Sequence, residues 1–163
     1  MADYAFRKVG QTDEALVKHW LAQPHIGGWW QDGATEWGMI AADLANPAID
    51  MRIVTTDGTD MGFIQDYDVH NWPAPQFDDL QAGARAVDTF LGDPAFLGQG
   101  HGTGYVAARL ADLQRAHTTI VTDPATTNTR AIAAYTRAGF LPHRVTPCDD
   151  GTFVHVLKST TCL

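Results

Sequence analysis

Cysteine is scarce in this chain. The two cysteines, Cys148 and Cys162, lie near the carboxyl terminus and do not have the spacing of zinc ligands. Such a sequence is not expected to carry a disulfide framework or a structural metal. We therefore predict no metal site.

Basic side chains are few. Lysine and arginine number 11 against 19 acidic residues, which gives a formal net charge of −8. A protein that holds nucleic acid by its phosphates needs positive surface, so this class of partner is not expected. The same negative field favours a cationic small molecule as a partner.

Long apolar runs are also missing. No stretch approaches the length of a membrane span, and the amino terminus lacks the charged and then apolar pattern of a signal peptide. There is no linker, repeat or low-complexity tract, and 163 residues suit one domain. We predict a single domain over residues 1–163 that is cytoplasmic and does not contact a membrane.

The hydrophobic spacing predicts an α/β fold. Helices are expected at 12–21 with Thr12 as a possible cap, at 35–44, at 105–113, and after Asn128; strands are expected at 4–9, 51–56, 61–68, 84–91, 118–122, 140–146 and 152–158. Residues 70–82 are expected to form a long loop. The strand, helix and strand between 84 and 122 imply parallel pairing. We predict a mixed sheet of six to seven strands flanked by helices, with a cleft where the strand before the 105–113 helix parts from the strand after it.

A glycine-rich turn precedes the helix expected at 105–113. Gly100, Gly102 and Gly104 alternate there, which lets the backbone approach a ligand while free N–H groups at the helix start point at an anion. The turn lacks the Gly-Lys-Ser/Thr ending of a P-loop. Two interpretations remain, a phosphate-binding loop or an ordinary turn between strand and helix.

A second pattern follows at 128–140. Asn128 is a good helix cap, Ile132 and Tyr135 share one helical face, and Gly139 supplies the left-handed residue that ends a helix. By itself this pattern is equally typical of any capped helix that returns to a sheet.

Together, Gln99-x-x-Gly102-x-Gly104 and the later Asn128 to Phe140 stretch resemble motifs A and B of the GCN5-related N-acetyltransferases (GNAT), in the order found there. The resemblance implies that the loop cradles the pyrophosphate of acetyl-coenzyme A. The cofactor contacts it implies are Phe90, Gln99, Gly100, His101, Gly102, Thr103, Gly104, Asn128 and Arg130. The ring of His101 is expected to point to solvent.

Almost the whole chain resembles a narrower group, the aminoglycoside 6′-N-acetyltransferases. The matching stretches are 25–26, 29–30, 62–65 with Tyr67, 87–91, 97–103, 122–124 with Asn128, and 130–140. Asp88 and the Asp123-Pro124 pair are the most telling, because generic acetyltransferases need neither. The resemblance implies that Asp88 lies beside the reacting amine and acts as base, and that Asp123 helps to bind the aminoglycoside.

The chemistry agrees with this reading of Asp88. An amine arrives as an ammonium ion and must lose a proton before it attacks a thioester, and a carboxylate can attract the cation and accept that proton. An aspartate near its free pKa of about 3.9 is a weak base, so burial or neighbouring acidic groups are expected to raise the pKa. The alternatives are that Asp88 faces solvent or only positions the cation.

Other site residues follow from the same resemblance. Tyr135 stands where many acetyltransferases place a tyrosine that protonates the departing thiolate, although it can equally be a core aromatic. A backbone N–H near Phe90 is the natural donor to the oxyanion. The acceptor site is expected to be walled by Trp29, Trp30, Gln65, Asp66 and Tyr67, together with Asp88 and Asp123. The two tryptophans can also be packing residues.

Several alternatives stay open. Both cysteines lie outside the motifs, so we expect direct transfer in a ternary complex without an acetyl-cysteine. The loop at 70–82 departs from the family pattern, which leaves the acceptor open. Related enzymes that acylate lysine-derived siderophore precursors usually carry histidine at the Asp88 position, and peptide amino-terminal acetyltransferases share the cofactor loop. A non-catalytic acyl-CoA-binding module is the alternative of another class. Both a monomer and a homodimer fit the sequence.

Overall fold

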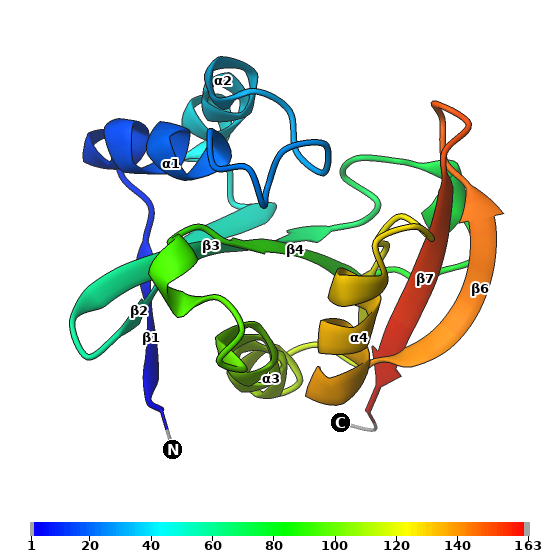
Figure 1. Cartoon of the computed structure of the whole chain (residues 1–163). Helices are drawn as coiled ribbons and strands as arrows, with labels where there is room; N and C mark the ends of the chain where they lie inside the picture. The colour runs from blue at the N-terminus through cyan, green and yellow to red at the C-terminus, as the bar shows by residue number, and fades with distance from the viewer. Residues whose placement is uncertain (1, 162–163) are drawn as a thin grey trace. The chain divides into compact units, whose positions relative to one another are not determined.

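The computed structural model describes residues 2–161 of the chain (Figure 1). These residues form two compact units. Among the described residues, the first unit comprises 2–65 and 89–101, and the second comprises 66–88 and 102–161.

Seven strands form one mixed sheet in the order β1-β2-β3-β4-β5-β7-β6. The strands are β1 Tyr4–Lys8, β2 Ile49–Thr56, β3 Thr59–Asp68, β4 Arg85–Leu91, β5 Thr119–Thr122, β6 Leu141–Pro147 and β7 Phe153–Thr160. The helices are α1 Glu14–Leu21, α2 Gly33–Asp43, α3 His101–Leu113 and α4 Thr129–Ala138. The predicted α/β class and the mixed sheet with its flanking helices are confirmed.

The first unit begins with antiparallel strands. β1 pairs with β2 from Tyr4 opposite Thr56 to Lys8 opposite Arg52. The turn between β2 and β3 contains Asp57 and Gly58, both at positive φ (48° and 77°). Two central residues at positive φ match the twist of a tight hairpin, which explains the Asp-Gly pair. The predicted hairpin is confirmed.

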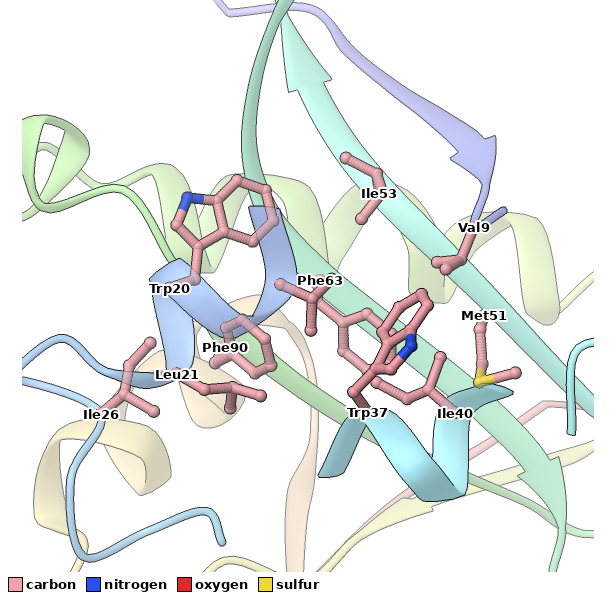
Figure 2. Packing of buried hydrophobic residues seen from close by; sticks show 11 residues of the cluster. Val9, Trp20, Leu21, Ile26, Trp37, Ile40, Met51, Ile53, Phe63 and Phe90 are labelled. Carbon is pink, nitrogen blue, oxygen red and sulfur yellow. The ribbon is translucent and has the colours of Figure 1, made fainter. Parts of the chain in front are cut away.

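An apolar cluster holds the helices of the first unit to its strands. α1 and α2 lie side by side in Figure 1 and contribute Trp20 and Trp37 to this cluster. Figure 2 shows these rings close to Phe63 of β3 and Phe90 of β4. The Phe63 and Phe90 rings stack with centroids 5.3 Å apart. Burial of four aromatic side chains fixes how this end of β4 is packed.

The second unit contains the parallel pair. β4 and β5 pair at two positions, Arg85 with Ile120 and Ala86 with Val121, so the predicted parallel pairing is confirmed. β7 pairs antiparallel with both β5 and β6. β4 continues past its two paired residues to Leu91. The cleft expected at this point stays a prediction.

The motif B helix has both of the caps that its sequence predicts. The Asn128 side chain accepts a hydrogen bond from the Ala131 N–H at 3.2 Å. Gly139 follows α4 at φ 122°, and its N–H bonds to carbonyls of the last turn. In Figure 1, α4 runs beside β7. Local side-chain chemistry therefore sets both ends of α4.

Three helix starts differ from the prediction. Thr12 is not the cap of α1, because a short 3-10 turn precedes this helix and Asp13 takes the N-cap position. α2 begins two residues early, because the Asp32 side chain accepts a hydrogen bond from the Thr35 N–H at 3.0 Å. α3 begins at His101, inside the glycine run and before the expected start at 105.

Two further observations concern residues 2–161. None of the helices there is long and apolar enough to cross a membrane. In the same range, no group of three or more histidine, cysteine or acidic side chains could hold a metal ion. Cys148 is a free thiol, and Cys162 lies outside the described residues.

Candidate functional site

Two acidic residues of the second unit interact. Asp88 lies on β4 and Asp123 directly follows β5, so both lie toward the carboxyl ends of neighbouring parallel strands. The charge of Asp88 acts on Asp123 and on two tyrosines, Tyr67 of β3 and Tyr135 of α4. Four predicted site residues from four parts of the chain are thus brought together. Asp88 is half-buried, which argues against the alternative that it faces open solvent.

Burial and the neighbouring charge change the titration of Asp123. Burial is the largest cause and the charge of Asp88 the second, and together they raise the pKa of Asp123 to about 7. The Gln76 side chain opposes this by donating a hydrogen bond from Nε2 to Asp123 Oδ2 at 3.0 Å. A carboxyl that titrates near neutral pH can exchange a proton with a substrate amine. From the sequence, a raised pKa was expected at Asp88, and the structure shows it at the neighbouring Asp123.

Tyr135 is buried beside the acidic pair. Its ring meets Phe140 edge to face at 5.7 Å, and its side chain is hydrogen bonded to that of Thr122. Burial, and after it the charge of Asp88, raises the pKa of Tyr135. The phenol therefore stays protonated at neutral pH and can donate a hydrogen bond, but losing its proton is made harder.

Tyr67 is the second phenol at the pair. Burial is the main cause that raises its pKa, and the charges of Asp88 and Asp123 add to it. The ring meets Trp72 edge to face at 5.5 Å. Tyr67 thus connects the acidic pair to the loop at 70–82.

Asp66 differs from the other acidic residues predicted for the substrate site. Its side chain is 2% exposed. Arg85 Nε donates to Oδ1 at 3.1 Å, and Arg109 Nη2 donates to Oδ2 at 2.9 Å. Two guanidinium groups thus occupy this carboxylate, which argues against the predicted contact with a substrate ammonium. The ion pairs join β3, β4 and α3 instead.

The predicted residues of the first unit have different surroundings. The Trp30 ring meets Phe90 at 5.0 Å and Phe63 at 6.2 Å, both edge to face, so it packs on the core. Trp29 is 48% exposed. Gln65 is half-buried on β3.

The first part of the glycine loop is built from backbone turns. Gly98 and Gly100 have positive φ angles of 72° and 81°, which glycine adopts most easily. Gln99 Nε2 donates to the Ala95 carbonyl at 2.8 Å. The exposed Gln99 side chain is thereby turned back onto its own loop.

The expectation that the His101 ring points to solvent was wrong. Its Nδ1 lies 3.0 Å from the Tyr4 hydroxyl, and its ring meets those of Tyr4 and Phe96 edge to face. The ring is therefore held by side chains of the first unit, while the His101 backbone begins α3.

The remaining loop residues, Gly102, Thr103 and Gly104, lie in the first turn of α3. The N–H groups of a first helical turn have no partner within the helix and are suited to an anion. A Cβ added at Gly102 would meet nothing within 4 Å. Of the motif B candidates, Asn128 caps α4 and Arg130 is exposed.

Sequence reasoning missed two polar contacts. Gln76 reaches Asp123 from the loop at 70–82, and His25 Nε2 lies 2.7 Å from the Leu91 carbonyl. The contact of His25 could have been suspected from the sequence, because His25 stands in a stretch that resembles the family. No sequence pattern indicates the contact of Gln76, since its partner Asp123 is far away in the sequence.

Three comparisons relate this chain to known proteins. Residues 10–146 match the family described as acetyltransferase (GNAT) domain. An aminoglycoside N(6′)-acetyltransferase type 1 from Klebsiella pneumoniae is 30% identical over 168 residues, which cover 94% of this chain and 81% of that relative.

Solved structures give the same result. The crystal structure of the aminoglycoside acetyltransferase AAC(6′)-Ib in complex with coenzyme A matches with a TM-score of 0.85 at 27% identity, over 97% of this chain and 95% of that one. The same enzyme in complex with coenzyme A and kanamycin matches with a TM-score of 0.84, again at 27% identity and over 97% and 95% of the two chains.

Proposed function

This chain belongs to the GNAT acetyltransferase family, and we propose that it transfers the acetyl group of acetyl-coenzyme A to the 6′-amine of aminoglycosides. The main observation in favour of an aminoglycoside acceptor is the interacting pair of Asp88 and Asp123, because two acidic side chains suit a cationic amine. The similarity to aminoglycoside acetyltransferases over nearly the whole chain supports the same acceptor.

The glycine loop fits the coenzyme. The pyrophosphate of coenzyme A would be held by the N–H groups at the start of α3, where Gly102 leaves open space. The proposed contacts are those named from the sequence: Phe90, Gln99, Gly100, His101, Gly102, Thr103, Gly104, Asn128 and Arg130. The bound coenzyme supplies an activated acetyl thioester.

Asp88 and Asp123 have different roles in the proposed mechanism. Asp88 accepts the proton that the amine must lose, and Asp123 holds the ammonium form in place. The two carboxylates are close enough for one to raise the pKa of the other, so a proton taken up there relieves their repulsion. The pair therefore takes up a proton more readily than an isolated aspartate does.

Backbone and phenol groups complete the proposed site. The N–H at Phe90 would donate a hydrogen bond to the thioester carbonyl oxygen of bound acetyl-coenzyme A. Tyr135, whose hydroxyl stays protonated, would donate toward its sulfur. Trp29, Trp30, Gln65 and Tyr67 are proposed to line the acceptor side, and Asp66 is left out because two arginines hold it.

The chain is proposed to act as one domain over residues 1–163, because the family match spans 10–146 and one sheet contains all seven strands. Its oligomeric state and cytoplasmic location stay predictions.

The test is release of coenzyme A thiol from acetyl-coenzyme A. Kanamycin, tobramycin, amikacin and gentamicin are compared with spermidine, lysine and a short peptide. We expect saturable turnover with the aminoglycosides, and acetylation at the 6′-amine in the product. Turnover confined to lysine or the peptide would overturn the proposed acceptor. Coenzyme binding without turnover of any amine would point to a non-catalytic module.

The Asp88→Asn variant tests the proposed base. Loss of a general base lowers kcat/KM by about 100-fold to 10,000-fold, while the affinity for acetyl-coenzyme A should not change. Asp112→Asn is the matched control, because it removes one negative charge from an exposed position on α3. Equal activity of the two variants would rule out Asp88 as the base.

A further inference from the structure

The side chain of Gln76 donates a hydrogen bond to one member of the acidic pair. Its Nε2 lies 3.0 Å from Asp123 Oδ2. A donor at this distance favours the ionised form of a carboxyl group and restricts its rotation. Gln76 therefore acts on Asp123 against both the burial and the charge of Asp88.

The backbone of Gln76 is itself anchored. Arg144 of β6 donates from Nη2 to the carbonyl oxygens of Pro75 at 3.1 Å and of Gln76 at 3.0 Å. Further along the loop, Asp79 lies 2.6 Å from His143 Nε2 and 3.4 Å from Arg144. The start of β6 thus holds the loop in place, and the loop presents Gln76 to Asp123.

The other end of the same amide is also informative. Gln76 Oε1 is buried and has no hydrogen-bond partner among residues 2–161. Buried acceptors are normally paired, so this atom is suited to a donor from a bound molecule. An ammonium or hydroxyl group of an acceptor held by Asp123 is such a donor.

We propose that Gln76 is a positioning residue for the acceptor: it orients the Asp123 carboxylate through its hydrogen bond and accepts a hydrogen bond from the bound amine. This inference rests on the proposed function and deepens it. It also gives the loop at 70–82 a role, since this loop departs from the family pattern and carries Gln76. From the neighbouring elements, the charge of Asp88 of β4 acts on Asp123, and the charge of Asp123 in turn acts on the phenols Tyr67 of β3 and Tyr135 of α4.

The first experiment needs no turnover. Carboxyl ¹³C resonances of aspartate are followed against pH by NMR in the free enzyme, and Asp123 is identified by its loss in Asp123→Asn. In Gln76→Met, which lacks the donor, we expect the Asp123 midpoint to rise by about 0.5–1 pH unit. In Gln76→Glu, which replaces the donor with a third carboxyl group, we expect a larger rise. Gln81→Met, an exposed change in the same loop, should leave the midpoint unchanged.

The second experiment is the pH profile of kcat/KM with kanamycin. The acidic limb should move to higher pH in Gln76→Met by the same amount as the NMR midpoint, with a higher KM and a nearly unchanged kcat at high pH. A midpoint and an acidic limb that both stay within about 0.2 unit of the unmodified enzyme would overturn the inference. Absence of aminoglycoside turnover in the unmodified enzyme would instead refute the proposed function, and the NMR titration would still decide the effect on Asp123.

Discussion

Asp123 is a carboxyl group that the fold makes difficult to ionise. Burial and the charge of Asp88 both disfavour its charged form, and hydrogen bonds from the Gln76 side chain and from the backbone only partly offset them. Residues held in such surroundings often reduce stability while serving a site. The contribution of Asp123 to the stability of the folded protein should therefore depend on pH.

We predict that Asp123→Asn stabilises the protein at high pH. The folded pKa of Asp123 is about 7, above the ordinary value of 3.8, so the folded state binds more protons than the unfolded state between these values. Stability is thus lost as the pH rises from about 4 to about 7. The asparagine cannot ionise. The free energy of unfolding of the variant should therefore exceed that of the original protein by on the order of 1–2 kcal/mol at pH above about 8, and by little at pH below about 4.

Urea unfolding of both proteins across this pH range measures the effect. Asp112→Asn, at an exposed position, is the control for the loss of one negative charge. A gain that is the same at both ends of the range would contradict the proton linkage.

Single residues also show what a sequence can and cannot indicate about a site. Asp88 and Asp123 could be named because a family resemblance assigned them roles. Asp66, two positions from β3's end, looked like a third acidic contact, but Arg85 and Arg109 neutralise it. These partners lie 19 and 43 residues away, and no local pattern shows such pairing.

At the scale of elements, local signals predicted most of the fold. The Asp57-Gly58 turn, the Asn128 cap and the Gly139 stop each depend on the residue's own backbone preference and nearest neighbours. The start of α3 was placed too late, because glycines at 102 and 104 are poor helix formers. Glycine inside a helix lowers stability by about 1 kcal/mol relative to alanine. Helix stability therefore does not explain why glycine stands at position 102.

We predict that Gly102→Ala separates stability from coenzyme affinity. A Cβ at this position meets nothing within 4 Å in the free protein, so the variant should be at least as stable as the original. If the pyrophosphate lies against this backbone, the methyl group should raise the KM for acetyl-coenzyme A by about 10-fold or more.

Two glycine variants serve as controls for Gly102→Ala. Gly38→Ala, a helical glycine of α2 with open surroundings, should stabilise without any change in KM. Gly100→Ala should destabilise by about 1–2 kcal/mol, because Gly100 has a φ of 81°. Thermal unfolding and steady-state kinetics of the three variants test these expectations. An unchanged coenzyme KM in Gly102→Ala would place the pyrophosphate elsewhere.

The whole molecule carries a net charge of −8, and its two proposed substrates have opposite charges. A global negative field attracts a polycationic aminoglycoside and repels the anionic coenzyme. The coenzyme must then depend on short-range contacts with the glycine loop. These are screened by salt much less than long-range attraction.

Salt should consequently act on the two substrates in opposite directions. Between about 50 mM and about 500 mM NaCl, the screening length shortens to a few ångströms, so kcat/KM for kanamycin should fall steeply. The KM for acetyl-coenzyme A should stay constant or decrease, because screening removes repulsion. A monoamine such as glucosamine is the matched acceptor, and its kcat/KM should fall with a shallower slope. Equal slopes for the polyamine and the monoamine would mean that the acceptor is recognised by the local carboxylates alone, without assistance from the field of the whole molecule.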